Sequence, residues 1–376
     1  MKIVNIEVIP VLCKLDEPLK WGDMVVNVKG STLIRVLTDN GIVGVGEAGF
    51  SAIYAPWINI HIERLKPLVI GQDPFYVEKI WEEIFSATHM WGRRGMETYA
   101  ISGIEIALWD IIGKACNRPV YKLLGGFKDK VRCYAAPSLK EPKIIKKECE
   151  KFVEEGFTAI KLRTGLGFDE DLAIVKSVRA VVGKDVELMV DANMAYDHNK
   201  AIEMSKRLLR YDVSFFEEPV RARSPEEYVR EMLRLKKKIE IPLAGGECLF
   251  TRYEFGELIS KQAVDIVQPD ATSVGGLLEC KKIGVMASVW GLKCIPHIAC
   301  SSIPAFGLAA NLHVICSLPN SPLIEYDPYD NPLRREIVKG QLYAERGFLK
   351  APVTQGLGLE LKEQVLKKYA VSKINP

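Results

Sequence analysis

Residues 186–191 read Val-Glu-Leu-Met-Val-Asp, a short apolar run that ends on a carboxylate. Such a run predicts a buried strand. Similar runs recur to residue 324, with amphipathic helical patterns such as 169–182 and 224–237 between them. We predict eight strands, at residues 131–135, 159–162, 186–190, 215–216, 242–244, 265–267, 293–295 and 323–324. Eight strands alternating with helices indicate a parallel barrel of the α/β class. The alternative is an open doubly wound sheet, but no Gly-x-Gly-x-x-Gly opens the first unit.

The residues on either side of this region have other patterns. Residues 1–50 are strand-like, and Asp39-Asn40-Gly41 between two apolar runs predicts a hairpin whose tight turn needs positive φ. The period becomes helical from about Trp57 to Cys116, which indicates an α+β module. After Tyr326, turn-forming residues precede one helical pattern at 361–369, too short to fold alone. We therefore predict three parts: residues 1–125, the barrel at 126–326, and a tail at 327–376 that packs on the first part.

Composition excludes several classes of protein. The 376 residues hold 51 Lys and Arg against 48 Asp and Glu, a net charge of +3, with no clustered basic stripe. This disfavours binding to nucleic acid or to an anionic membrane. The uncharged segment 294–324 contains His and Asn residues, so we expect it in a protein core, not in a bilayer. Nine scattered cysteines without a Cys-x-x-Cys pair, and no signal-like start, predict reduced, buried thiols in a cytoplasmic protein.

Polar residues end the predicted strands. In a parallel barrel the carboxyl ends of the strands form the active site, so these side chains should converge. From Arg163 to Glu325 they follow one another at intervals of 23 to 30 residues, about one strand–helix unit. In chain order they are Lys161 and Arg163, Asp191 and Asn193, Glu217 and Glu218, Glu247, Asp270, His297 and Glu325.

Three of these carboxylates, Asp191, Glu217 and Glu247, would end neighbouring strands. Without a partner they would repel and raise one another's pKa. A hard cation such as Mg²⁺ takes oxygen ligands, and the absence of Cys or His from the trio disfavours zinc. Each carboxylate could instead cap the helix that follows it. We predict a Mg²⁺ site on the three, with Glu218 turned away if Glu217 points into the barrel mouth, because side chains alternate along a strand.

His297 and Asp270 would end adjacent strands. A carboxylate on one imidazole nitrogen fixes the tautomer and leaves the other nitrogen free to accept a proton, so the pair is a candidate general base. Only His297 falls in phase with the carboxylate series. The other histidines are expected in core or surface positions: His61, His89, His198 and His313.

Lys161 and Arg163 lie two residues apart, which places both cations on one face of a strand. Lysine can be tuned to act as a base, whereas arginine does not lose its proton in proteins. If Arg163 lies opposite His297, the face of the substrate that meets Arg163 has no evident base. The alternative is a pair of solvated cations at the end of the strand.

Several motifs together resemble the enolase superfamily, specifically its mandelate racemase subgroup, over nearly the whole chain. They are Arg93-Arg94-Gly95, residues 103–110, Leu123-Leu124-Gly125-Gly126, Lys161-Leu162-Arg163, Asp191-Ala192-Asn193, Glu217-Glu218-Pro219, Gly246-Glu247, Gln268-Pro269-Asp270, Gly275-Gly276 and His297. The resemblance implies an α+β capping domain, completed by the tail, over a (β/α)7β barrel of the TIM type. It implies that Asp191, Glu217 and Glu247 bind Mg²⁺ and that His297 and Asp270 form the base pair. It also implies that Glu325 donates a hydrogen bond to the substrate carboxylate and that Asn193 lies near the substrate.

The chemistry shared by the superfamily is removal of the proton α to a carboxylate, giving an enediolate stabilised by Mg²⁺. This chain departs from the racemases at Arg163, where they carry a second basic lysine. With one base, β-elimination is easier than racemisation. That departure and the segment 92–95 resemble the acid-sugar dehydratases.

We therefore expect a Mg²⁺-dependent lyase that converts an aldonate or aldarate into a 2-keto-3-deoxy acid. The alternatives are a racemase or epimerase of a 2-hydroxy acid, and a barrel that binds a sugar acid without turnover. Loops near residues 21–29 and 51–57 are expected to select the substrate. We expect the chain to form a homo-oligomer and to bind a small-molecule sugar acid.

Overall fold

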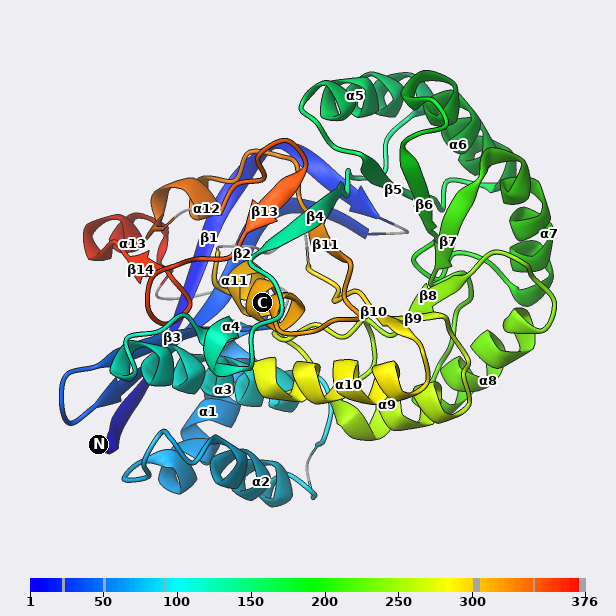
Figure 1. The fold of residues 1–376 in the computed structure, drawn as a ribbon. Helices are drawn as coiled ribbons and strands as arrows, with labels where there is room; N and C mark the ends of the chain where they lie inside the picture. The colour runs from blue at the N-terminus through cyan, green and yellow to red at the C-terminus, as the bar shows by residue number, and fades with distance from the viewer. Residues whose placement is uncertain (22–23, 50–51, 91, 300–304, 341, 372–376) are drawn as a thin grey trace.

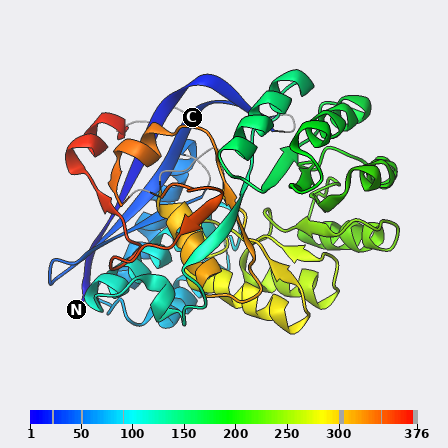
Figure 2. The same ribbon diagram turned by 45° about the horizontal axis from the view of Figure 1, so that its top comes forward.

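The computed structural model describes residues 1–21, 24–49, 52–90, 92–299, 305–340 and 342–371. A three-stranded antiparallel sheet with helices packed on it lies beside a larger parallel sheet ringed by helices (Figure 1). Figure 2 shows the same arrangement after a turn about the horizontal axis that brings the top of Figure 1 forward.

The N-terminal sheet has the order β1-β2-β3, with β1 at Ile3–Trp21, β2 at Met24–Thr38 and β3 at Val43–Ala48. The predicted hairpin is present, but its connection is longer than a two-residue turn. Gly41 has φ 83°, whereas Asn40 is not among the residues with positive φ. The Asn40 side chain instead accepts a hydrogen bond from the Thr38 hydroxyl at 2.7 Å, which stabilises the wider loop.

Two helices pack on this sheet, α1 at Ala55–Val69 and α3 at Met96–Ala115, and α2 at Val77–Ala87 packs on both of them. Glycines bring α3 and β3 into close contact. A Cβ atom on Gly46 would lie 2.1 Å from the Gly103 carbonyl oxygen, and one on Gly44 would lie 2.1 Å from that of Ala107. Only glycine permits this approach, which fixes α3 on the sheet.

The second sheet contains all eight predicted strands, which lie parallel in the order β10-β9-β8-β7-β6-β5-β4-β11. The strands are β4 Lys130–Ala135, β5 Ala159–Arg163, β6 Glu187–Asp191, β7 Val213–Glu217, β8 Leu243–Gly245, β9 Ile266–Val267, β10 Lys293–Cys294 and β11 Leu323–Tyr326. The first strand pairs with the last, and the Cys294 amide donates to the Asn320 carbonyl at 3.0 Å. These contacts exclude the open doubly wound sheet and confirm the barrel.

One helix follows each of the first seven strands in the described part of the barrel. They are α5 Pro142–Glu154, α6 Phe168–Val182, α7 His198–Leu208, α8 Pro225–Lys236, α9 Thr251–Ser260, α10 Leu277–Val289 and α11 Phe306–Cys316. Short helical segments η1 Ala52–Tyr54, α4 Val120–Leu123 and η2 Leu209–Tyr211 complete the connections. The architecture is therefore (β/α)7β, as the sequence predicted.

The tail contains more structure than the one predicted helix. Its elements are α12 Pro332–Glu336, β12 Val338–Lys339, β13 Phe348–Lys350, β14 Glu360–Leu361 and α13 Glu363–Tyr369. Strand β13 pairs antiparallel with β4 of the barrel, whereas Ala370 forms a bridge with Val11 of β1. The tail therefore contacts both larger parts of the chain.

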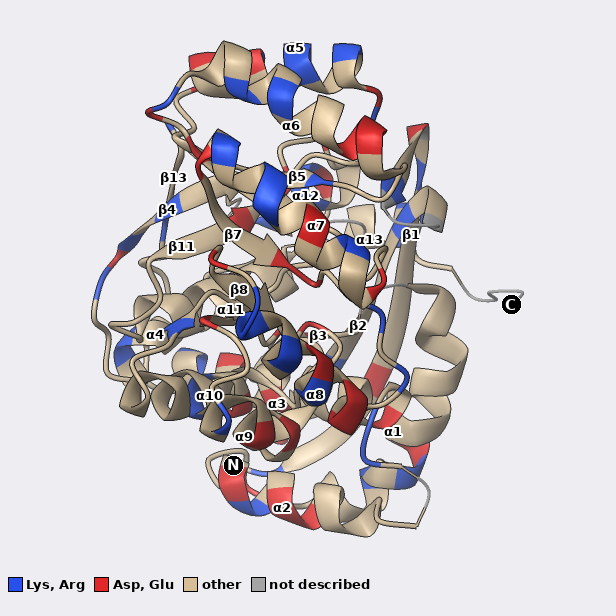
Figure 3. Ribbon diagram, turned by 90° about the vertical axis from the view of Figure 1, so that its right-hand side faces the viewer, with Lys and Arg blue, Asp and Glu red and all other residues tan. Residues whose placement is uncertain are grey.

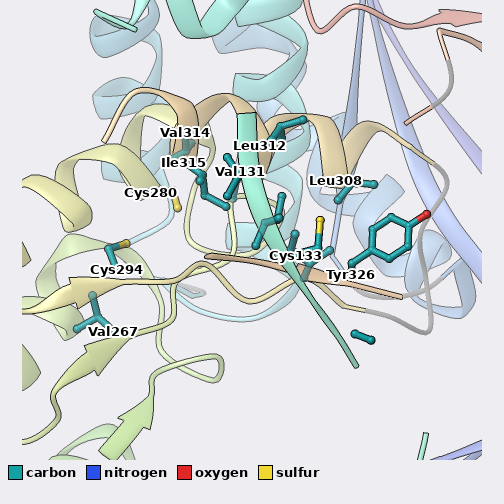
Figure 4. Packing of buried hydrophobic residues seen from close by; sticks show 14 of the residues in the cluster. Val131, Cys133, Val267, Cys280, Cys294, Leu308, Leu312, Val314, Ile315 and Tyr326 are labelled. Atoms are coloured by element: carbon teal, nitrogen blue, oxygen red, sulfur yellow. The ribbon is translucent and has the colours of Figure 1, made fainter. Parts of the chain in front are cut away.

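The uncharged segment predicted to be buried contains α11, whose residues are all buried. Figure 4 shows Leu308, Leu312 and Ile315 of this helix near Val131 and Cys133 of β4, in one apolar cluster. Among the residues described, no helix combines the length and apolar character needed to cross a bilayer. Figure 3 shows basic and acidic residues interspersed on the outer helices α5 and α8.

Three expectations about local structure need correction. The stretches near 21–29 and 51–57 are largely not loops: Trp21 ends β1, residues 24–29 belong to β2, and residues 55–57 begin α1. Residues 22, 23 and 51 lie outside the described chain. The eight described cysteines are free thiols, but Cys116 and Cys248 are exposed, not buried. Cys300 also lies outside the described residues.

His313 is buried inside α11, and its Nδ1 accepts a hydrogen bond from the Tyr121 amide at 3.1 Å. Burial lowers the pKa of this imidazole to about 4, with the Leu357 backbone opposing the shift. The unfolded chain, with an ordinary histidine pKa near 6.5, then binds a proton that the folded chain excludes. The contribution of the neutral His313 to the free energy of unfolding is fully present above about pH 6.5 and is lost as the pH falls toward 4.

We expect His313→Gln to remove this dependence. The difference in unfolding free energy between the natural protein and the variant should shrink by up to about 3 kcal/mol between pH 7 and pH 4. Urea unfolding at a series of pH values measures it. A difference that stays constant over this range would show that His313 does not remain neutral in the fold.

Candidate active site

The predicted site residues lie at or just beyond the carboxyl ends of the barrel strands. Lys161 and Arg163 are on β5, Asp191 ends β6, Glu217 ends β7, and Glu325 is on β11. The remaining four follow their strands by two or three residues: Asn193, Glu247, Asp270 and His297.

Lys161 is fully buried and lies among carboxylates from three other strands. Its Nζ is 2.7 Å from Glu217 Oε1, 3.2 Å from Glu325 Oε1 and 3.5 Å from Asp191 Oδ2. Burial alone would lower the pKa of this ammonium, but the carboxylates hold it well above its ordinary value. Lys161 is therefore a buried cation in this arrangement, and it is not solvated as the alternative interpretation required.

Arg163 extends the same positive charge toward β6. Its Nη1 donates to Asp191 Oδ2 at 3.1 Å and to Asn193 Oδ1 at 2.9 Å. The backbone N–H of Asn193 donates in turn to Asp191 Oδ1 at 2.9 Å. Asn193 has φ 42°. The turn after β6 therefore brings the Asn193 side chain beside Arg163.

The three carboxylates of the predicted metal site do not cap helices. The N-cap residues of α7, α8 and α9 are Asp197, Ser224 and Phe250. Among the residues described, no three His, Cys, Asp or Glu side chains are arranged to hold a metal ion. Cations of the chain occupy the oxygens instead: Lys161 on Glu217, Arg163 on Asp191 and His297 on Glu247.

The charge balance at the strand ends nevertheless suits a bound cation. The strand ends carry more carboxyl groups than cations: Asp191, Glu217, Glu218, Glu247, Asp270 and Glu325 against Lys161, Arg163 and the His297 imidazolium. The pKa of Glu217 rises to about 8, first because it is buried and further because Asp191, Glu325 and Glu247 are near, against the effect of Lys161. Oxygen donors with surplus negative charge fit a hard divalent ion such as Mg²⁺.

Glu218 has partners different from those of Glu217. It has φ 42°, and its Oε1 accepts hydrogen bonds from the Tyr228 hydroxyl at 2.8 Å and the Gly246 amide at 2.9 Å. Glu217 instead faces Lys161 and receives a hydrogen bond at 2.8 Å from the Gln268 side chain. Glu218 therefore supports the backbone just before Glu247.

His297 and Asp270 form the expected pair, with the imidazole Nδ1 3.2 Å from Asp270 Oδ2. The other nitrogen is not free, because Nε2 lies 3.0 Å from Glu247 Oε2. Burial would lower the pKa of His297, but Glu247, Asp270 and Glu325 raise it to about 10. Nε2 would become available to a substrate only if Glu247 turned to another partner.

Glu325 accepts a hydrogen bond from the Ile298 amide at 3.1 Å and faces Lys161. Burial would raise its pKa, but Lys161, His297 and Arg163 lower it to about 2. Glu325 is thus an acceptor here, and the donor role implied by the resemblance needs a proton that these surroundings disfavour.

Three residues that contact the site carboxylates were not predicted from the sequence: Gln268, Thr272 and Asn311. Gln268 orients Glu217, and the other two donate hydrogen bonds to Asp270. Gln268 could have been predicted, because it lies two residues before Asp270 in the motif Gln268-Pro269-Asp270. Nothing in the pattern around Asn311 distinguishes it from other polar residues in a helix.

The N-terminal part reaches the barrel mouth at several points. The Leu139 amide, after β4, donates to the Lys20 carbonyl at 2.8 Å, near the end of β1. Lys29 forms a fully buried ion pair with Asp327, two residues after Glu325. Glu47 accepts a hydrogen bond from the Gly307 amide at 2.7 Å, at the start of α11.

Comparison with known proteins identifies the family. Residues 3–125 match the family model for the mandelate racemase / muconate lactonizing enzyme N-terminal domain, and residues 145–365 match that described as enolase C-terminal domain-like. An arabinonate dehydratase from Saccharolobus solfataricus is 40% identical over 343 residues, which are 89% of each chain. Other curated relatives are also named as sugar-acid dehydratases.

Two solved structures have the same fold. The 3,6-anhydro-D-galactonate cycloisomerase from Zobellia galactanivorans is 33% identical, with a TM-score of 0.89 over 99% of this chain and 100% of that one. A racemase from Streptomyces coelicolor, solved with bound magnesium, is 25% identical, with a TM-score of 0.88 over 98% and 100% of the two chains. These matches confirm the resemblance: the chain is an enzyme of the hydro-lyase class and belongs to the mandelate racemase/muconate lactonizing enzyme family of the enolase superfamily.

Proposed function

We propose that this enzyme dehydrates a sugar acid, an aldonate or an aldarate, to a 2-keto-3-deoxy acid. In this reaction a base removes the proton α to the carboxylate, the C3–OH bond breaks, and water leaves. The resulting enol then becomes the 2-keto acid. The observation that carries the proposal is the pairing of His297 with Asp270, together with two cations on β5, of which Arg163 does not titrate and Lys161 is paired with carboxylates.

In this proposal each site residue has its own role. His297 takes the α proton on Nε2, and the same nitrogen can return it to the departing hydroxide. Asp270 holds Nδ1 and stabilises the imidazolium. Lys161 and Arg163 bind the substrate carboxylate, with Asn193 beside Arg163. Glu325 keeps Lys161 in position and balances the positive charge of its ammonium group.

Asp191, Glu217 and Glu247 would hold Mg²⁺ in this proposal. The bound ion would supply positive charge where the substrate carboxylate becomes an enediolate. Binding it requires Lys161, Arg163 and His297 to release the oxygens that they now contact. For His297, that release exposes the nitrogen on which the proposed base depends.

Racemisation of a 2-hydroxy acid is the second candidate, and its weakness is the face opposite His297. A racemase needs a proton donor and acceptor there. Arg163 does not titrate, and Lys161 faces three carboxylates.

The cytoplasmic location and the homo-oligomeric state stay predictions.

A substrate panel tests the reaction directly. Five- and six-carbon aldonates and aldarates, arabinonate among them, are incubated with the enzyme and Mg²⁺, and the products are analysed by mass and for 2-keto-3-deoxy acids. We expect loss of one water from at least one substrate. Products that keep the mass of the substrate would favour isomerisation or epimerisation, and no product from any of them would favour a binding protein.

His297→Asn tests the base with the substrate found in that panel. Asparagine keeps a hydrogen-bonding group of similar size but cannot accept the α proton, so turnover should fall by at least about 10²–10⁴-fold. Exchange of the α proton with D₂O should stop as well. The matched control is His89→Asn, an exposed histidine just after α2 whose ring contacts the Ser86 carbonyl, which should keep full activity. Exchange that persists in His297→Asn while dehydration stops would move the base elsewhere, with Lys161 the first candidate.

Removal of the metal is the next prediction. EDTA should abolish turnover, and Mg²⁺ should restore it. Asp191→Asn and Glu247→Gln should each weaken binding of the probe ion Mn²⁺, measured by electron paramagnetic resonance, because each removes one negative oxygen donor. Glu360→Gln, an exposed carboxylate paired with Lys339, serves as the control. Full turnover in EDTA would contradict the metal assignment.

A further inference from the structure

The two oxygens of the Asp270 carboxylate have different surroundings. Oδ1 accepts three hydrogen bonds: from the Thr272 amide at 2.9 Å, from the Thr272 hydroxyl at 2.9 Å and from Asn311 Nδ2 at 3.1 Å. Oδ2 faces His297 Nδ1 at 3.2 Å. Three donors on one oxygen fix the plane of the carboxylate, which leaves the other oxygen directed at the imidazole.

Asn311 has a forced orientation. It is fully buried on α11, and its Oδ1 accepts a hydrogen bond from the Ala271 amide at 3.0 Å. Because that backbone N–H can only donate, the carboxamide oxygen must face it. Nδ2 is thereby directed to Asp270 and to the Gly307 carbonyl, both at 3.1 Å. The side chain thus links the β9–α10 connection, which carries Asp270, to the first turn of α11.

That first turn is attached to the N-terminal part of the chain. Glu47 is buried and accepts hydrogen bonds from the Gly307 amide at 2.7 Å and the Ser31 hydroxyl at 2.6 Å. A Cβ atom on Gly307 would lie 2.9 Å from Thr272 Cγ2 and 3.2 Å from Glu47 Oε2, so a larger residue there would displace one of these side chains. A continuous set of hydrogen bonds therefore runs from β3 through Gly307 and Asn311 to Asp270 and His297.

We propose that Asn311 is a positioning residue for the base: it fixes the Asp270 carboxylate and, through it, the tautomer and orientation of His297. Glu47 anchors this link on the N-terminal domain. The inference rests on the proposed role of His297 as the base. Fixing Oδ2 on Nδ1 keeps the proton on Nδ1 and leaves Nε2 for the substrate once Glu247 turns to another partner. Without Asn311 the carboxylate keeps its two donors from Thr272 but loses the one from α11, so the direction of the imidazole is held less firmly.

The first experiment needs no substrate. Histidine-selective ¹⁵N labelling gives five imidazoles, and His297→Asn assigns the signal of interest. In the natural protein, the His297 Nδ1 proton should exchange slowly with water, because Asp270 holds it. Asn311→Ala should make this exchange fast. Thr272→Val, which removes one donor to Oδ1 and keeps the shape of the side chain, should have a smaller effect in the same direction.

Asn320→Ala is the matched control. The Asn320 amide also donates two hydrogen bonds to carbonyls, those of Gly284 and Leu292 at 3.0 Å each, but it has no contact with Asp270. Its loss should leave the His297 signal unchanged. An unchanged His297 signal in both Asn311→Ala and Thr272→Val would overturn the proposal.

The second experiment uses the dehydration assay. Asn311→Ala should lower kcat by about 10–100-fold, a range typical for loss of a residue that orients a ligand or base, and change KM by less than about threefold. In an Asp270→Asn background the same substitution should have little further effect, since both act through one carboxylate. Full additivity of the two losses would show that Asn311 acts independently of Asp270 and would contradict the proposal. An Asp270→Asn variant with normal kcat would instead contradict the proposed base and leave the NMR result to judge the orientation of His297.

Discussion

The buried ammonium of Lys161 is the interaction on which the barrel mouth depends. A buried charge is costly unless it is paired, and breaking such a pair leaves the partner charge uncompensated. Here the partners come from β6, β7 and β11, so one side chain connects strands that are far apart along the chain. Glu217 is held between Lys161 and Gln268, and Asp191 between Arg163 and the turn at Asn193. The carboxylates still outnumber the cations, which is why this end of the barrel suits a divalent ion and an anionic substrate.

The N-terminal domain contacts the barrel helices beside the site. The glycines of β3 bring α3 against the N-terminal sheet, and buried carboxylates from this part of the chain then meet the starts of two barrel helices. Glu105 accepts hydrogen bonds from the Leu277 and Leu278 amides at α10, and Glu47 accepts one from Gly307 at α11. Negative charge at a helix N-terminus is favourable. These two helices follow the connections that carry Asp270 and His297, so docking of the domains and orientation of the base are physically linked.

Much of the fold could be predicted because it depends on local pattern. Apolar runs of strand length, amphipathic helices between them and a polar residue after each run gave the eight strands and their order. The convergence of Lys161, Asp191, Glu217 and Glu325 followed from strand topology alone. The strands of the tail were missed, because β13 is only three residues long and is defined by pairing with β4, about 220 residues earlier in the chain.

Side-chain partners could not be predicted in the same way. Strand periodicity places Lys161 on a face, but not its choice among several carboxylates. The contact of His297 Nε2 with Glu247 and the hydrogen bond from Asn311 to Asp270 depend on rotamers and on how α11 packs. The donor role expected of Glu325 followed the resemblance, whereas its surroundings here favour an ionised acceptor.

The central claim is that one base acts on one face of the substrate, and a single measurement tests it most directly. The enzyme and its substrate are incubated in D₂O to partial conversion, and the recovered substrate is analysed by NMR for deuterium and configuration at C2. One-base dehydration predicts recovered substrate with its original configuration, whether or not it carries deuterium at C2. Recovered C2 epimer that carries solvent deuterium would require a second base on the face of Lys161 and Arg163, and would contradict the account.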